Sequence, residues 1–341
     1  MVRTKKTPST TRFSIKDVAR ASGVSISTVS RVINKFPSVK EKSQQKVLEV
    51  IKQLNYQPSL LAQRLATGKS NVISLIIPRY EGMFYSFYLL ELIRGIGTLC
   101  QVLKLDLLLN ITDSNNRINF NGLGGVIFAD IIGNRIQLEE ALVSGVPVIV
   151  INNCVTNFAV SYIAIDNIGG AENAVDYLVG LGHKNIVHIS GDLNTQSALQ
   201  RLEGYKRSLE KNRISFNEGY VLKTDYSRGQ ARIAAEKILK IPKRPTAVFV
   251  SSDSMALEVM TVVVEKGLKV PNDLSIIGYD DNPSGLYGPV ALTTVRQPLV
   301  RMAEQAVKEL KVLMDAKDKP KIKRMLLQTE LIVRESCASV K

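Results

Sequence analysis

Side chains that can bind a polar ligand follow several apolar runs in the second half of the chain. Carboxylates, a hydroxyl, a guanidinium and a phenol come after the runs IVHIS, AVFVS and SIIGY, namely Asp192, Arg201, Tyr226, Ser252, Asp253 and Asp280. A carboxylate and a guanidinium can bind vicinal hydroxyls through charge-assisted hydrogen bonds, and an aromatic ring can cover the apolar face of a sugar. The residues therefore predict a binding site for a small polar molecule.

Each of these residues also has a structural role open to it. Asp253 can cap the helix that follows it, and Tyr226 can belong to the hydrophobic core. Arg201 and Asp280 can form an ion pair that serves the fold alone. The ligand-binding interpretation therefore depends on whether the fold brings the residues together.

The elements that would position them are short strands alternating with helices. Apolar runs at residues 72–77, 105–109, 125–128 and 146–151 are separated by longer mixed segments, and similar runs recur at IVHIS, AVFVS and LSIIGY. This alternation predicts parallel sheets covered on both faces. Residues 71–341 exceed one such sheet, so we expect two similar subdomains. We expect crossing segments near residues 160 and 290, final strands that return to the first subdomain, and a ligand cleft at the facing strand ends.

The N-terminal fifth of the chain has a different character. Residues 1–69 hold 14 Lys and Arg against 3 Asp and Glu, whereas the remaining residues hold 31 against 28. Such a concentration of positive charge favours a polyanion, because neutralising phosphates releases condensed counterions. A basic arm that is merely solvated is the alternative on charge alone.

Residues 14–32 carry the pattern of two short helices joined by a tight turn. Apolar residues fall at helical spacing in both stretches, and Ala19, Gly23 and Val29 stand at offsets 0, 4 and 10. Alanine permits close helix approach, glycine permits the turn and valine fills the small core. The pattern predicts a helix-turn-helix, with Ser14 and Ser25 as N-caps.

A second helix lying in the major groove would present its first residues to the bases. Ile26 and Ser27 are the predicted base readers, because isoleucine can touch a thymine methyl group and serine can bond to several base edges. Capping alone is the alternative role for the serines. The full set of predicted DNA-binding residues of this domain is Ser14, Lys16, Ser25, Ile26, Ser27, Thr28, Ser30, Arg31 and Asn34.

The motifs SIKDVARASGVSISTVSRVIN and LNYQPSLLAQRLATGKS resemble the headpiece and hinge of the LacI/GalR family of bacterial repressors. Later segments continue the resemblance, among them LGHKNIVHISG, PTAVFVSSDSMAL, GLKVPNDLSIIGYDD and LLQTELIVRES, so it covers roughly residues 14–336. It implies a helix-turn-helix headpiece and a core like the periplasmic sugar-binding proteins. It also implies a homodimer on a palindromic double-stranded DNA operator, controlled by a small effector, which we expect to be a sugar.

The resemblance also divides the chain and assigns residues. It implies a DNA-binding domain at 14–56, a hinge helix and linker at 57–70, and the core at 71–341. We expect residues 1–13, before the resemblance begins, to be a mobile basic arm. In the hinge, the residue matching the family's minor-groove leucine is Leu65; a plain linker with Leu65 on the core is the alternative. For the effector site the resemblance supports Arg201, Tyr226, Ser252 and Asp280, with Asp253 nearby.

Two segments depart from the family pattern. IPRYEGMFYSFYLLELIRGI is longer than the usual segment after the first strand and lacks its asparagine-proline-aromatic-aromatic element, so we expect Phe84, with Tyr85 and Phe87, to replace it. Which ring meets the effector stays open. NITDSNNRINFNGLGGVIF is too short for the usual crossover helix between the second and third strands, which predicts an altered outer face.

Other functions lack their sequence signals. Two histidines and three scattered cysteines give little for a metal site, and the phosphate-loop, HExxH and GxSxG motifs of enzymes are absent. We therefore predict no catalysis, no metal and no cofactor. The apolar runs are too short for a membrane span and the N-terminus has no signal-peptide pattern, so we expect a cytoplasmic protein. The alternative function is that of a non-specific architectural DNA-binding protein.

Overall fold

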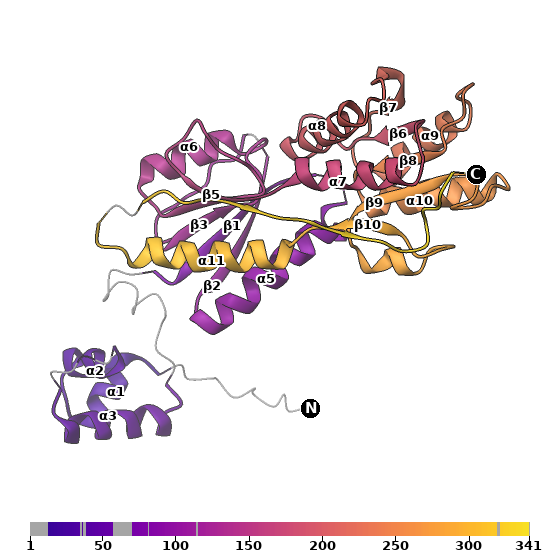
Figure 1. Ribbon diagram of the computed structural model, residues 1–341. Coiled ribbons are helices and arrows are strands. Elements are labelled where there is room, and N and C mark those ends of the chain that lie inside the picture. Colours follow the sequence, from indigo (N-terminus) through magenta and orange to yellow (C-terminus); the bar gives the residue numbers. More distant parts are fainter. Residues whose placement is uncertain are drawn as a thin grey trace, which may run out of the picture. The chain divides into compact units, whose positions relative to one another are not determined.

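The computed structural model of the protein describes residues 13–34, 36, 39–56, 70–80, 82–113, 115–318 and 321–340 (Figure 1). The chain forms two compact units, Met1–Asn71 and Val72–Lys341, here called the headpiece and the core. Nearly all of the predicted arm and hinge, including Leu65, lies outside the described residues. The headpiece and the core are each considered by themselves.

The headpiece consists of three short helices around a very small hydrophobic interior. Its helices are α1 Ile15–Ser22, α2 Ile26–Ile33 and α3 Glu41–Gln53. Gly23, between α1 and α2, has a φ of +65°, a conformation that favours glycine. The buried apolar residues are those that the helix-turn-helix pattern requires, joined by two from α3: Val18, Ala19, Val29, Val32, Val47 and Val50.

The first sheet of the core is parallel throughout. Its strands are β1 Val72–Pro78, β2 Asp106–Thr112, β3 Gly125–Phe128, β4 Val148–Ile151, β5 Ser161–Ile165 and β11 Arg324–Leu327. Their order is β11-β5-β4-β3-β1-β2. The central strands β3 and β4 are fully buried, because helices cover both of their faces.

Two long helices cover one face of this sheet, and a shorter helix covers the other (Figure 1). The long helices are α5 Phe87–Leu103, preceded by the 3-10 turn η1 Met83–Tyr85, and α11 Leu299–Asp315; the shorter one is α6 Arg135–Ser144. Gly95 lets α5 and α11 meet, since a Cβ there would lie 2.7 Å from the Ala303 Cβ.

A loop replaces the family's crossover helix between β2 and β3, as predicted. The described residues between these strands contain no helix. Phe120 of this loop packs into the hydrophobic interior of the first subdomain. On the adjacent strands β1 and β2, Asn110 Nδ2 donates to Ser74 Oγ at 2.7 Å. A short loop with one buried aromatic residue, and a polar contact between adjacent strands, thus occupy this part of the first subdomain.

The second sheet is parallel except at one edge. Its strands are β6 Ile186–Ile189, β7 Val221–Leu222, β8 Ala247–Val250, β9 Ser275–Asp280, β10 Thr293–Arg296 and β12 Glu330–Ile332, in the order β12-β10-β9-β8-β6-β7. The strand β12 runs antiparallel to β10. The helices of this subdomain are α7 Asn167–Gly180, α8 Gln196–Lys211, α9 Arg228–Ile238 and α10 Asp253–Glu265, with 3-10 turns η2 Glu218–Tyr220 and η3 Pro283–Leu286.

The chain passes between the two sheets three times. The first two crossings follow β5 and β10, near the residues predicted. The prediction that the final strands return to the first subdomain is wrong for β12. Only β11 joins the first sheet, and β12 pairs with β10 because the chain crosses again at residues 328–329. The end of the chain stays with the second sheet, where the Ile276 amide donates to Ser336 O.

Candidate functional site

The N-terminus of α2 presents two side chains to solvent. Ser25 caps the helix, and its Oγ accepts the Thr28 amide at 3.1 Å and lies 2.7 Å from Ser27 Oγ and 2.9 Å from Thr28 Oγ1. Ile26 is 44% exposed although it is a large apolar residue, and Ser27 is also exposed. The fold therefore leaves Ile26 available for contact, while the capping interactions hold the adjacent hydroxyls.

The other predicted DNA-binding residues of the headpiece lie around the same two helices. Ser14 caps α1, with its amide and Oγ both donating to Asp17 Oδ2, at 2.9 and 2.7 Å. These bonds lower the pKa of Asp17, the backbone bond most. Lys16 and Arg31 are exposed, and Asn34 ends α2 with its Nδ2 donating to Ser30 Oγ at 3.4 Å. The predicted DNA-binding residues that cap a helix thus have a structural role in addition to the predicted contact with DNA.

In the core, Arg201 is the centre of a buried cluster at the strand ends of the second sheet. It is only 4% exposed, and its Nε donates to Asn167 Oδ1 at 3.0 Å while its Nη1 donates to Ser251 O at 2.5 Å. Its guanidinium carbon lies 3.9 Å from the centre of the Tyr279 ring. The arginine is therefore fixed in place by α7, β8 and β9.

Asp280 and Asp253 carry the negative charge of this cluster. Asp280 ends β9 and accepts a hydrogen bond from Gln297 Nε2 at 2.5 Å. Asp253 accepts from Thr294 Oγ1 at 2.6 Å and from the Asn282 amide at 2.7 Å. Burial raises the pKa of Asp280 to about 6 and that of Asp253 to about 7, and the charge of Asp280 adds to the shift of Asp253.

These contacts answer two of the structural alternatives. No ion pair joins Arg201 to Asp280 among the described residues, although Arg201 lies near enough to oppose the rise in the Asp280 pKa. The cap of α10 is Ser252, whose Oγ accepts the Met255 amide, and Asp253 is the first helical residue. Asp253 anchors the turn after β9, which makes it a group that positions Asp280.

Tyr226 has an unusual backbone and an unpartnered hydroxyl. Its φ is +68°, a conformation that costs a residue with a large side chain about 1–3 kcal/mol. Its ring packs so closely on Gly191 that a Cβ there would lie 1.9 Å from Tyr226 Cζ. Among the described residues, the buried Tyr226 and Ser251 hydroxyls have no hydrogen-bond partner. Strain and unpaired hydroxyls at strand ends are typical of a ligand site.

The first subdomain contributes a facing set of residues that the sequence analysis did not single out. Asp130 follows β3, Asn152 and Asn153 follow β4, and Tyr88 Oη donates to Ala129 O at 2.7 Å. Burial raises the pKa of Asp130, and Asp192 in the second subdomain contributes to the shift. The two groups of strand ends therefore face each other closely enough to interact electrostatically.

One side chain links the two subdomains beside this site. Gln196, the first residue of α8, accepts the Cys154 amide on Oε1 at 2.6 Å and donates from Nε2 to Cys154 O at 3.1 Å. Both hydrogen-bonding groups of the Cys154 peptide are thus bound by one amide. We call the residues around these strand ends the strand-end site: Tyr88, Asp130, Asp192, Arg201, Tyr226, Ser251, Ser252, Asp253 and Asp280.

Phe84 stands apart from the other predicted effector residues. It lies on η1 and is 60% exposed, and Tyr85 beside it is 92% exposed. Tyr80 and Tyr88 of this segment do reach the neighbourhood of Asp130, whose charge contributes to the raised pKa of both hydroxyls, although burial is the larger cause. An effector contact for Phe84 stays a prediction.

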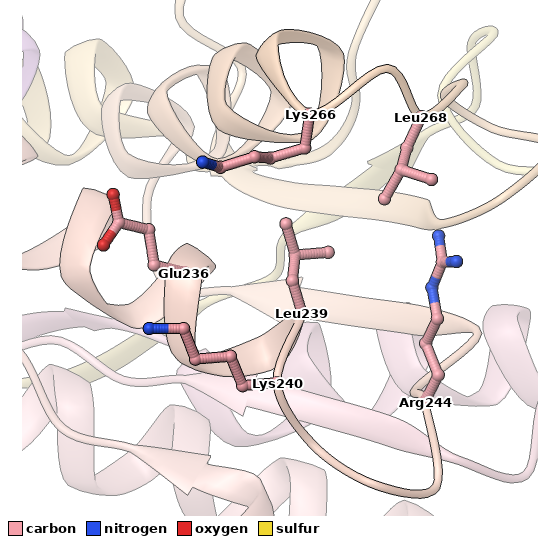
Figure 2. Close-up of a pocket in the computed structure, with 6 residues that line it drawn as sticks. All are labelled: Glu236, Leu239, Lys240, Arg244, Lys266 and Leu268. Atoms are coloured by element: carbon pink, nitrogen blue, oxygen red, sulfur yellow. The ribbon is translucent and has the colours of Figure 1, made fainter.

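One hollow in the core lies away from the strand-end site. It has a volume of about 350 Å³ and is lined by Glu236, Leu239, Lys240, Arg244, Lys266 and Leu268. Figure 2 shows Leu239 at its centre with charged side chains around it. Lys266 follows the last residue of α10, whereas Asp253 begins that helix, so about 20 Å of helix separates the hollow from the strand-end site.

Comparisons with known proteins cover most of the chain. Residues 14–59 match the family of bacterial regulatory proteins named lacI, and residues 175–337 match the periplasmic binding protein-like domain. Catabolite control protein A of Priestia megaterium is 35% identical over 305 residues, which cover 87% of this chain and 91% of that protein. The chain belongs to the LacI family of bacterial regulatory proteins.

Solved structures of LacI-family members share the fold. The lac repressor dimer bound to operator and the anti-inducer ONPF has a TM-score of 0.82 at 26% identity, covering 96% of this chain and 99% of that one. The complex of the transcriptional regulator CelR with cellobiose has a TM-score of 0.72 at 25% identity, covering 95% and 100%. The predicted family and fold are confirmed: this LacI-family chain is a DNA-binding transcriptional regulator.

Two further findings concern the described residues alone. None of the helices in the described part of the chain is long and apolar enough to cross a membrane. Across the same residues, no group of three or more histidine, cysteine, aspartate or glutamate side chains could hold a metal ion.

Proposed function

We propose that this LacI-family regulator represses transcription as a homodimer on an inverted-repeat operator and that a sugar bound at the strand-end site controls its affinity for DNA. The observation that carries the proposal is the cluster of Arg201, Tyr226 and Asp280 at the strand ends. A fixed guanidinium, an unpartnered phenol and a carboxylate are suited to binding hydroxyl groups. The same chain carries a helix-turn-helix in which Ile26 and Ser27, at the start of α2, are exposed.

The proposal for DNA reading rests on the headpiece. Ile26 and Ser27 lie exposed at the start of α2, where a recognition helix meets the bases. Two copies related by a two-fold axis would read two half-sites of an inverted repeat. The solved lac repressor dimer on its operator supports this arrangement. A protein that binds a chromosomal operator acts in the cytoplasm and needs no catalytic group.

The proposal for effector control rests on the link between the subdomains. A ligand that contacts both groups of strand ends shifts the relation between the subdomains, and that shift reaches the headpieces through residues 57–69. By thermodynamic linkage, a ligand that weakens DNA binding is itself bound less tightly by the DNA complex. We propose an inducer, and the cellobiose bound by CelR supports a sugar as its class.

The experiment is fluorescence anisotropy of the purified protein on its own promoter DNA, with a panel of sugars. Release of the promoter duplex by one sugar supports the proposal. Binding that a ligand strengthens identifies a corepressor instead. Equal affinity for promoter and scrambled duplexes, unchanged by every sugar, supports an architectural DNA-binding protein.

A further inference from the structure

The hollow at the ends of α9 and α10 is lined by apolar as well as charged side chains. Leu239 and Leu268 are half-buried and pack against the buried hydrophobic cluster of the second subdomain. The volume of about 350 Å³ falls within the range of small-molecule sites, which is about 300–1,000 Å³. We call this place the basic hollow, and its lining residues are Glu236, Leu239, Lys240, Arg244, Lys266 and Leu268.

Backbone turns fix both sides of the basic hollow. Gly267 follows α10 with a φ of +74°, and the Leu268 amide donates to Val263 O at 3.1 Å. On the other side, the Lys240 amide donates to Lys237 O at 3.0 Å after the end of α9. These turns hold the two leucine side chains against the hydrophobic cluster, so the shape of the hollow is set by the fold.

The cations of the basic hollow differ from those that lie between the same two helices. Arg228 and Arg232 of α9 form ion pairs with Glu258 of α10, at 2.8 and 2.9 Å. In the part of the chain that the structure describes, no ion pair is formed by the cations of the hollow, which are Lys240, Arg244 and Lys266. Three cations and the carboxylate of Glu236 give the lining a formal charge of +2, which attracts an anion.

The helix ends account for only part of this charge. Lys240 and Lys266 lie just beyond the last residues of α9 and α10, where the partial negative charge of a helix C-terminus favours a cation. Arg244 lies instead in the loop between α9 and β8. A guanidinium at this position therefore needs another explanation.

Figure 2 shows where an anionic group would lie. Arg244 and Leu268 stand on one side of Leu239, and Glu236 stands on the other side. Arg244 is thus the cation that lies away from the carboxylate of the hollow, and a guanidinium binds carboxylate and phosphate groups through two parallel hydrogen bonds. An inorganic anion or a nucleic-acid backbone would satisfy Arg244 but leave both leucines uncovered. A ligand with an apolar part would cover them as well.

We propose that the basic hollow binds a small organic anion, in which a carboxylate or phosphate group is attached to an apolar ring or chain. Arg244 binds the anionic group, with further attraction from Lys240 and Lys266, and the apolar part covers Leu239 and Leu268. This ligand is distinct from the proposed effector, because about 20 Å of α10 separates the hollow from the strand-end site.

The test is a titration of the full-length protein with five probes, followed by saturation-transfer difference NMR. Benzoate and phenyl phosphate carry both parts of the ligand. Benzamide carries the ring without the charge, whereas acetate and methyl phosphate carry the charge without the ring. We expect benzoate or phenyl phosphate to bind about tenfold or more tightly than benzamide and than its own methyl counterpart. The tighter of the two ring anions identifies the head group.

Arg244→Gln should reduce this preference to about threefold or less, and the fold should stay intact because Arg244 is exposed. Arg301→Gln is the matched control and should keep the full preference, since Arg301 is an exposed arginine of α11 that forms no ion pair among the described residues. Benzamide or methyl compounds that bind as tightly as the ring anions overturn this inference, and so does absence of binding by all five probes. A preference that survives Arg244→Gln overturns the assignment of the anion to the basic hollow.

Discussion

Gly191 provides a direct test of how the strand-end site is built. The Tyr226 ring lies against its backbone, and an alanine Cβ at this position would lie 1.9 Å from Tyr226 Cζ and 2.3 Å from both Cε atoms. Ordinary contacts between carbon atoms are about 3.5–4.0 Å. Gly191→Ala must therefore displace the ring by more than an ångström. Because Tyr226 already has a left-handed backbone, the residue has little freedom to adjust.

The expected cost follows from overpacking. Inserting a methyl group into a well-packed region destabilises a protein by about 1–3 kcal/mol. For a core of this size we expect the Tm to fall by about 2–10 °C. The proposed sugar should also be needed at about tenfold higher concentration to release promoter DNA, because the ring would no longer cover it. Affinity for DNA without sugar should be unchanged.

The assay combines thermal unfolding, followed by circular dichroism, with anisotropy titration on promoter DNA. Gly229→Ala is the matched control, because Gly229 lies in α9 and a Cβ there meets nothing within 4 Å. Alanine favours helix by about 0.5–1 kcal/mol, so this variant should be equally or more stable than the wild type. A Gly191→Ala protein that melts and responds to sugar like the wild type would refute the placement of Tyr226 over Gly191.

Three further predictions concern both parts of the protein. Combined replacement of Ile26 and Ser27 by alanine should remove about 1–3 kcal/mol of preference for the operator, while salt-sensitive binding to unrelated DNA persists; retained preference in competition anisotropy would exclude them as base readers. The free energy of unfolding of the core should fall as pH rises from about 4 to about 7, because Asp253 has a pKa of about 7 when folded and an ordinary one when unfolded, so in this range the folded state holds an extra proton that it has lost at higher pH. Asp280→Asn should flatten that dependence, measured by denaturant unfolding, since the Asp280 charge helps to raise the Asp253 pKa; an unchanged slope would contradict the coupling. Gln196→Leu removes two hydrogen bonds between the subdomains, which should cost about 1–2 kcal/mol of stability and lower the Tm by a few degrees. A Tm equal to that of the wild type would show that these two hydrogen bonds contribute no net stability.

The architecture followed from periodicity. Apolar runs at 125–128 and 146–151 coincide with or contain β3 and β4, because strands buried on both faces read as continuous apolar segments. The edge strand β12 has no such signal, since its residues are exposed or half-buried. Its pairing with β10 is decided by where the chain crosses between sheets, which local sequence does not encode.

The strand-end site was predictable on one side. A polar residue after each apolar run led to Asp192, Ser252 and Asp280, and the same rule applied to GVIF and VPVIVI would have found Asp130 and the asparagines at 152 and 153. Two other features had no local signal. The left-handed backbone of Tyr226 and the contact of Gln196 with Cys154 arise from packing between distant segments.

The measurement that tests the central claim most directly is anisotropy of the full-length protein on its own promoter duplex and on a scrambled duplex at one salt concentration, with and without sugars. We predict binding to the promoter at least about a thousandfold tighter than to the scrambled duplex, and release by one sugar. Equal binding to both duplexes, unaffected by any sugar, would contradict the account.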